Sequence, residues 1–128
     1  FRKGNLRKFP RHDPCRYESA FTKKQRDLWF SQIWTVTAAR QTASQIERRI
    51  AAFPDEIVER LVRMFSVKGD MVLDPFLGSG TTVKAAMANE RSIVGYEVDE
   101  SLVPLVKKKI ANKPHAECNV NFVKRSLS

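Results

Sequence analysis

Cysteine and histidine are scarce in this chain of 128 residues, and long apolar runs are absent. The two cysteines, Cys15 and Cys118, stand far apart without a paired spacing, so the sequence predicts neither a disulfide framework nor a zinc site. The two histidines, His12 and His115, also lack metal-ligand spacing. No segment approaches the roughly 20 apolar residues that cross a bilayer, and no apolar signal core follows the N-terminus. We therefore expect a soluble, cytoplasmic protein that holds no metal and contacts no membrane.

Acidic residues are few in the first part of the chain. Residues 1–49 hold 12 Lys/Arg against 4 Asp/Glu, a net charge of +8, whereas residues 50–128 hold 11 against 10. A local excess of positive charge raises the affinity for a polyanion, so this part is a candidate surface for a phosphate backbone, with Lys23, Lys24 and Arg26 as candidate contacts. A solvated basic tail is the alternative interpretation of the same charges.

The basic part of the chain divides into an arm and an aromatic segment. Residues 1–20 have no apolar period and are interrupted by Gly4, Pro10 and Pro14, which predicts an extended basic arm. Residues 22–30 predict a short helix capped by Thr22, and residues 33–36 are strand-like. The large aromatic side chains here either stack on bases or fill a core or subunit interface: Trp29, Phe30 and Trp34. We expect residues 1–45 to contact DNA or a partner and residues 46–128 to form a separate domain.

From residue 53 onward, helical and strand patterns alternate. Pro54 and the two acids after it suit a helix start, and the apolar spacing predicts a helix to Phe65 with Glu59, Arg60 and Arg63 facing out. Further helices are expected over residues 82–89 and 99–109, and strands over residues 71–73, 92–96 and 119–123. This order predicts an α/β fold with a parallel, doubly wound sheet.

The stretch from Met71 to Thr82 predicts a ligand site, because a buried strand runs into a glycine turn that opens a helix. Gly78 and Gly80 can adopt positive φ and keep a ligand's path clear, and Thr81 is a plausible helix N-cap. Two related motifs are excluded. A phosphate-binding P-loop needs Lys-Ser/Thr after its last glycine, and a nicotinamide fingerprint needs a third glycine where Val83 stands.

The string Asp-Pro-Phe-Leu-Gly-Ser-Gly-Thr-Thr at residues 74–82 closely resembles motif I of S-adenosylmethionine-dependent DNA methyltransferases that modify an exocyclic amino group. Glu97, at the end of the next expected strand, resembles motif II of the same family, and its carboxylate can accept both ribose hydroxyls. Val98 would then lie against the adenine, while Asp99 is expected to cap the following helix. Residues 51–57 resemble motif X, with Ile50 where a histidine often stands.

The resemblance covers about residues 45 to 115 and implies a Rossmann-like class I methyltransferase sheet, incomplete in this chain, with a basic N-terminal arm. It implies S-adenosyl-L-methionine as cofactor and adenine N6 or cytosine N4 in double-stranded DNA as the methyl acceptor. The residues that the resemblance places around the cofactor are Ala52, Phe53, Pro54, Asp74, Phe76, Gly78, Ser79, Gly80, Thr81, Glu97 and Val98.

The family's catalytic motif, Asp/Asn/Ser-Pro-Pro-aromatic, is absent because this chain contains no Pro-Pro dipeptide. The nearest string, residues 13–17, has an extra residue and a wrong third residue. In the family's sheet, the strand that carries this motif lies beside the motif I strand, so the edge of residues 71–73 would otherwise be bare. We therefore expect a second polypeptide, or a removed segment, to supply the catalytic half. A non-catalytic nucleic-acid-binding subunit that keeps the cofactor fold, and an RNA methyltransferase, remain alternatives.

Overall fold

The computed structural model describes residues 7–36, 53–111 and 121–123. Its centre is a parallel pair of strands, β1 (Met71–Asp74) and β2 (Ser92–Gly95), joined by helix α5 (Thr81–Ala88). Met71 pairs with Ser92 and Asp74 with Gly95, so the two strands end side by side. The predicted strand–helix–strand unit is confirmed, and the fold is an incomplete Rossmann-like sheet.

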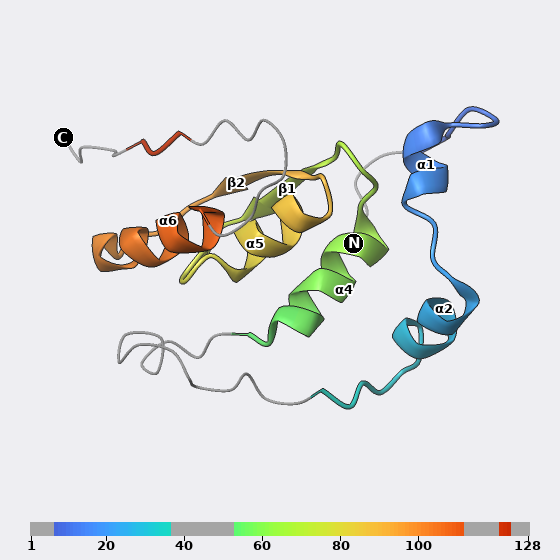
Figure 1. The fold of residues 1–128 in the computed structure, drawn as a ribbon, viewed down its shortest axis with the longest axis horizontal. Coiled ribbons are helices and arrows are strands. Elements are labelled where there is room, and N and C mark those ends of the chain that lie inside the picture. Colours follow the sequence, from blue (N-terminus) through green and yellow to red (C-terminus); the bar gives the residue numbers. More distant parts are fainter. Residues whose placement is uncertain (1–6, 37–52, 112–120, 124–128) are drawn as a thin grey trace.

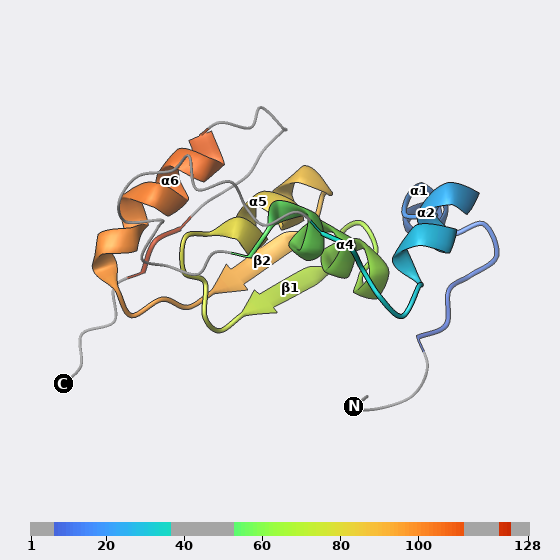
Figure 2. The ribbon, with the colours of Figure 1, turned by 90° about the horizontal axis from the view of Figure 1, so that it is seen from below.

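All helices around this pair lie on one side of it (Figures 1 and 2). Helix α4 (Asp55–Phe65) packs on α5, and α5 packs on α6 (Val103–Ala111), which follows the short turn η1 (Glu100–Leu102). The buried apolar side chains of these helices form the core: Val62, Val83, Ala85, Ala86, Leu102 and Val106. As predicted, Asp99 caps the last helical segment, and its carboxylate accepts from the amide of Ser101 at 2.9 Å.

The opposite face of the sheet is apolar and open. Met71 and Leu73 on β1 and Val94 on β2 are 64%, 63% and 42% exposed, and Leu73 pairs with Val94. Side chains of paired residues project to the same face of a sheet. Helices therefore cover only one face of the sheet. The second helical layer of the expected doubly wound arrangement is not formed within the part of the chain that the structure describes.

Two further strands were predicted, and their described residues are not in strands. Residues 121–123, the described part of the predicted third strand, are not in a strand, and residues 119–120 lie outside the described ranges. Residues 33–36 are also irregular, because the indole N–H of Trp34 bonds back to the carbonyl of Trp29 at 2.9 Å and turns the chain. The β-branched composition of this segment therefore did not translate into strand pairing.

Within the described part of the N-terminal arm, residues 14–18 are helical rather than extended. Helix α1 (Pro14–Glu18) begins at Asp13, whose carboxylate accepts from the amide of Arg16, and α2 (Lys23–Trp29) begins at Thr22 with a capping box to Gln25. The α2 prediction is confirmed. The prediction of an extended arm is wrong at residues 14–18, because Pro14 follows the N-cap Asp13 and so begins a helix instead of interrupting one.

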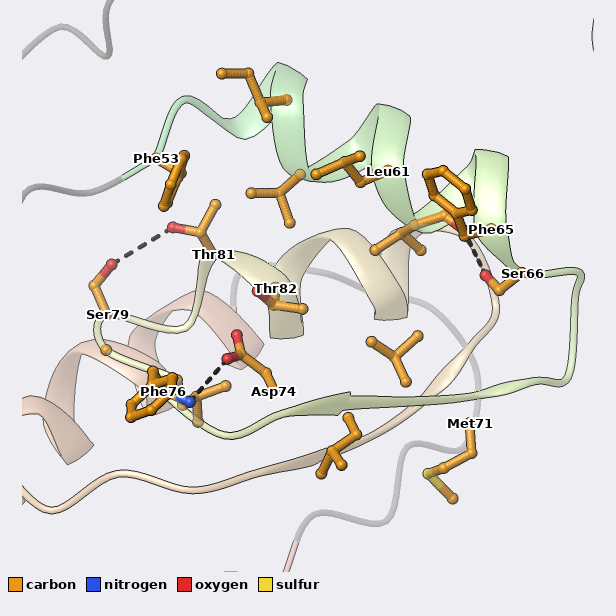
Figure 3. Close-up of a pocket in the computed structure, with 17 residues that line it drawn as sticks. Phe53, Leu61, Phe65, Ser66, Met71, Asp74, Phe76, Ser79, Thr81 and Thr82 are labelled. Carbon is orange, nitrogen blue, oxygen red and sulfur yellow. Dashed lines mark hydrogen bonds between the residues drawn. The ribbon is translucent and has the colours of Figure 1, made fainter. Parts of the chain in front are cut away.

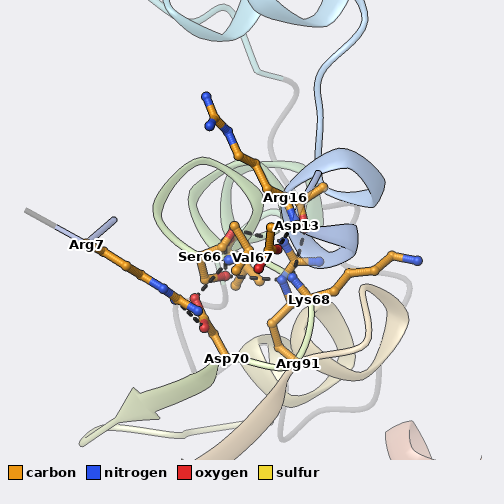
Figure 4. Close-up of polar contacts among 10 residues, drawn as sticks. Arg7, Asp13, Arg16, Ser66, Val67, Lys68, Asp70 and Arg91 are labelled. Carbon is orange, nitrogen blue, oxygen red and sulfur yellow. Dashed lines mark hydrogen bonds and ion pairs between the residues drawn. The ribbon is translucent and has the colours of Figure 1, made fainter. Parts of the chain in front are cut away.

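Ion pairs attach α1 to the turn that precedes β1 (Figure 4). Arg7 pairs with Asp70, Lys68 pairs with Glu18 and Glu90, and the hydroxyl of Ser19 accepts from the amide of Lys68 at 2.8 Å. These contacts place the arm at the beginning of β1, the end of the strand opposite the glycine turn.

The aromatic segment packs on α4 through arginines. The guanidinium of Arg63 lies 4.8 Å from the ring centre of Trp29 and 5.6 Å from that of Phe21, and Arg60 lies 5.2 Å from that of Trp34. Arg60 is only 3% exposed, so the prediction that it faces solvent was wrong. The guanidinium of Arg60 pairs with Glu56 through one nitrogen, while its other two nitrogens are buried without a hydrogen-bond partner among the described residues. The stacking on Trp34 therefore offsets only part of the cost of burying this charge.

Asp70 makes the attachment of the arm dependent on pH. Partial burial alone would raise its pKa, but donation from the amide of Val67 and from Arg7 outweighs this and holds the pKa below 3.8. The stabilisation is therefore complete above that ordinary value and is lost as the pH falls through the lowered one. We expect Asp70→Asn to reduce the free energy of unfolding by about 1 kcal/mol at pH 7, and by less near pH 3, in urea titrations.

The control for this prediction is Asp27→Asn, which removes an exposed carboxylate on α2. It is expected to leave unchanged the difference between the free energies of unfolding at pH 7 and near pH 3. Equal destabilisation by Asp70→Asn at both pH values would show that the carboxylate's charge is not the cause.

Candidate functional site

The glycine turn between β1 and α5 is held by hydrogen bonds from its backbone amides to groups on β1 and after β2. The amide of Leu77 donates to the carbonyl of Tyr96 at 2.9 Å, and the amide of Phe76 donates to the carboxylate of Asp74 at 3.0 Å. Gly78 and Gly80 have φ values of 54° and 79°, as their predicted role requires. Gly80, and not Thr81, is the helix N-cap, so the predicted capping role of Thr81 was wrong.

Gly80 is also needed for packing. A Cβ at this position would lie 3.1 Å from a methyl group of Val106 on α6. Helix α6 therefore packs directly against the turn. Only a residue without a side chain at position 80 lets Val106 come this close to the backbone of the turn.

Glu97 joins the end of β2 to the turn. One of its carboxylate oxygens accepts from the amide of Gly78 at 2.7 Å, and the other accepts from the amides of Val98 and Asp99, each at 2.8 Å. A carboxylate has about four acceptor sites, so one remains for a further donor. The structure thus brings Glu97 against the glycine turn.

A hydroxyl cluster lies at the start of α5. The Oγ of Ser79 and the Oγ1 of Thr81 are 3.5 Å apart, and the ammonium group of Lys109 donates to both, at 2.9 Å and 3.3 Å. Lys109 was not predicted as a site residue, since its position in the last turn of a helix indicated only a favourable interaction with the helix dipole.

An apolar groove of about 750 Å³ runs between α4 and β1 (Figure 3). We call its two ends the turn end, lined by Phe53, Asp74, Phe76, Gly78, Ser79 and Thr81, and the strand end, lined by Leu61, Phe65, Met71 and Leu73. At the turn end, Phe53 and Phe76 are 67% and 87% exposed, so two aromatic rings stand open beside a cluster of polar groups. Small-molecule sites commonly combine a concave apolar wall with a few convergent polar groups, as this end does.

Leu61 and Phe65 belong to the apolar stripe of α4, yet they are 42% and 80% exposed. They lie on the side of α4 that borders the groove, while the adjoining side of the helix packs on α5 through Val62. The apolar stripe of α4 is therefore wider than the surface that covers it.

The remaining predicted site residues are distributed unevenly. Pro54 is the N-cap of α4 near the turn end, and Val98 is 99% exposed next to Glu97 without lining the groove. Ala52 lies outside the described residues. The candidate DNA contacts are exposed on α2, near the end of α4 far from the turn: Lys23, Lys24 and Arg26.

The string nearest to the family's catalytic motif has a structural role. Its Asp13 caps α1 at the beginning of β1 and does not approach the turn. Over the described ranges, no three His, Cys, Asp or Glu side chains are placed to hold a metal, and no helix is long and apolar enough to span a membrane.

Comparisons with known proteins agree with this arrangement. Type II methyltransferase M.MjaI of Methanocaldococcus jannaschii is 56% identical over 128 residues, which cover 98% of this chain and 42% of the relative. Type II methyltransferase M.MthZI of Methanothermobacter thermautotrophicus is 41% identical over 86% of this chain and 32% of its own length. The chain thus spans less than half of each of these relatives.

A solved structure from Thermus thermophilus, assigned as a DNA modification methylase and complexed with S-adenosyl-L-methionine, superposes with a TM-score of 0.65. It is 38% identical and is matched over 84% of this chain and 39% of its own. The family model for DNA methylases of the N6/N4 type matches residues 3–108. This chain therefore belongs to the N6/N4 DNA methylase family.

Proposed function

We propose that this chain is the S-adenosyl-L-methionine-binding part of a DNA amino-methyltransferase that acts on adenine N6 or cytosine N4. The observation that carries the proposal is the contact of Glu97 with the glycine turn at the open, apolar turn end of the groove. A carboxylate beside bare glycine backbone suits a nucleoside with free ribose hydroxyls.

The residues present fit this cofactor by their chemistry. Glu97 would accept from a ribose hydroxyl at its remaining acceptor site, and exposed Val98 would offer an apolar surface to the adenine. Phe53 and Pro54, with Ala52 beside them in sequence, would line the methionine side. The turn would enclose the cofactor through Asp74, Phe76, Gly78, Ser79, Gly80 and Thr81. The cofactor, when bound, supplies an electrophilic methyl group.

Direct attack by the DNA amine needs no covalent enzyme intermediate, so no nucleophilic cysteine is required. Cys15 is exposed on α1, away from the turn. What the described residues supply is binding and orientation of the donor; the groups that accept the amine's protons are absent from the sequence, which has no Pro-Pro dipeptide.

The catalytic half is proposed to be a separate polypeptide segment that docks beside β1. Its binding surface would be the strand end of the groove together with the open sheet face, both of which are apolar and exposed. The outer edge of β1 is also unpaired among the described strands, and such an edge is a template for an added strand.

DNA is proposed to contact the basic arm. Residues 1–45 would form the DNA- or partner-contacting part and residues 46–128 the cofactor domain. Lys23, Lys24 and Arg26 are exposed and suited to phosphates, whereas Trp29 is buried against Arg63, so the core role of this aromatic is supported over base stacking.

The test is reconstitution. The chain is mixed with the part of M.MjaI that it does not match, and transfer of labelled methyl groups from S-adenosyl-L-methionine to duplex DNA and to RNA is measured. We expect the chain alone to bind the cofactor in calorimetry without methylating DNA, and the mixture to methylate DNA.

The matched variant is Met71→Lys, which adds a charge at the proposed docking surface, at the end of β1 opposite the glycine turn. It should abolish reconstitution while cofactor binding is kept. Methylation by the chain alone would refute the need for a partner; transfer to RNA in preference to DNA would refute the substrate, and absence of cofactor binding would refute the whole proposal.

A further inference from the structure

Lys109 reaches the turn end of the groove from α6, 28 residues beyond Thr81 in sequence. Its ammonium group contacts the hydroxyls of Ser79 and Thr81, which line the groove, but Lys109 does not line the groove itself. Ser79 and Thr81 are 4% and 8% exposed, so the contact takes place inside the protein. The described contacts of Lys109 with the groove are therefore made through these two hydroxyls.

The contact decides the direction of the hydroxyl protons. An ammonium group is only a donor, so the oxygens of Ser79 and Thr81 must accept from it, and their own protons remain available for other acceptors. One hydroxyl can donate to the other across 3.5 Å. The second then has its proton free to donate to a group in the groove.

The same contact decides which ligand group is favoured there. A hydroxyl that accepts from a cation is a stronger donor, and the nearby positive charge attracts an anion and repels a cation. S-adenosyl-L-methionine carries one anionic group, its carboxylate, and two cationic groups, its amine and its sulfonium. Phe53, proposed for the methionine side, lies beside Ser79 and Thr81 (Figure 3), so the amino-acid end of the cofactor is expected at this position.

We propose that Lys109 is a positioning residue that orients the hydroxyls of Ser79 and Thr81 toward the carboxylate of the cofactor. This inference rests on the proposed cofactor and adds a residue outside the three sequence motifs. Lys109 also links α6 to the glycine turn, against which α6 packs through Val106.

The test compares two ligands that differ only in the carboxylate: S-adenosyl-L-methionine and its decarboxylated form. Their dissociation constants are measured by calorimetry on the 128-residue chain. We expect Lys109→Met to weaken binding of S-adenosyl-L-methionine about 5- to 20-fold, the loss of a charge-assisted hydrogen bond, and to change binding of the decarboxylated form less than about twofold. Lys109→Arg should restore most of the loss.

Lys108→Met is the matched control, because this lysine is exposed on the same helical turn. It should leave both affinities unchanged. Ser79→Ala is a second variant, which removes a hydroxyl instead of the lysine and should show the same selectivity for the carboxylate. The melting temperature of each variant reports any general loss of structure.

Equal weakening of both ligands by Lys109→Met, or no weakening of either, would overturn the inference and leave the proposed function intact. A wild-type chain that binds neither ligand would overturn the proposed function and this inference together. A selective loss for the ligand with the carboxylate supports both.

Discussion

Replacing Glu97 with alanine is expected to lower the affinity for S-adenosyl-L-methionine by about 1–3 kcal/mol, roughly 5- to 150-fold. The carboxylate is proposed to accept from the ribose, and it also accepts from three amides, those of Gly78, Val98 and Asp99. The substitution therefore removes a ligand contact and releases the glycine turn from β2 at the same time. Isothermal calorimetry gives the change in affinity.

Two further variants test whether the carboxylate of Glu97 is the cause of the loss. Glu59→Ala removes an exposed carboxylate on α4 and should leave the affinity unchanged. Glu97→Gln keeps one acceptor oxygen but turns an N–H₂ group toward amides that are themselves donors, so it should weaken binding nearly as much as alanine does. An unchanged affinity for Glu97→Ala would rule out its contact with the ribose.

Replacing Gly80 with alanine should destabilise the fold by about 2–5 kcal/mol and prevent cofactor binding. A left-handed backbone costs a residue with a Cβ about 1–2 kcal/mol, and crowding a packed interface costs about 1–3 kcal/mol more. Both conditions hold at Gly80, whose φ is 79° and whose Cβ would meet Val106 at 3.1 Å. Urea denaturation followed by circular dichroism gives the loss.

Gly69 provides the matched control. Its φ is 81°, but a Cβ there would have nothing within 4 Å, so Gly69→Ala should cost only the backbone term of about 1–2 kcal/mol. Adding Val106→Ala to Gly80→Ala should make the double mutant less unstable than the two single effects predict together, because the crowding disappears. Equal costs at Gly69 and Gly80, or simple additivity with Val106→Ala, would show that α6 does not restrict the turn.

The cofactor turn and its flanking elements could be predicted because their signals are local. The glycines occupy positions where φ is positive, and the apolar runs on either side of α5 match β1 and β2 to within one or two residues. Glu97 could be predicted because the ends of neighbouring parallel strands meet at one edge of the sheet, so a carboxylate after β2 must approach a turn after β1.

The contacts between distant segments could not be predicted in this way. Arg60 follows a polar pattern on α4, and only the arrival of Trp34 explains its burial. Lys109 has the same sequence surroundings as Lys107 and Lys108, and its contact with Ser79 depends on the rotation of α6 against the turn. The exposure of Phe65 likewise depends on which surfaces the rest of the protein covers.

The short connection between the two strands has a consequence for the order of folding. From Met71 to Ser92, the first paired residues, the separation is 21 positions, and every other pair in the register has the same separation. The entropy lost in closing such a loop grows only slowly with its length, and contacts between nearby residues form early. The strand–helix–strand unit, with its glycine turn, can therefore assemble early, before the catalytic segment that we propose docks beside β1.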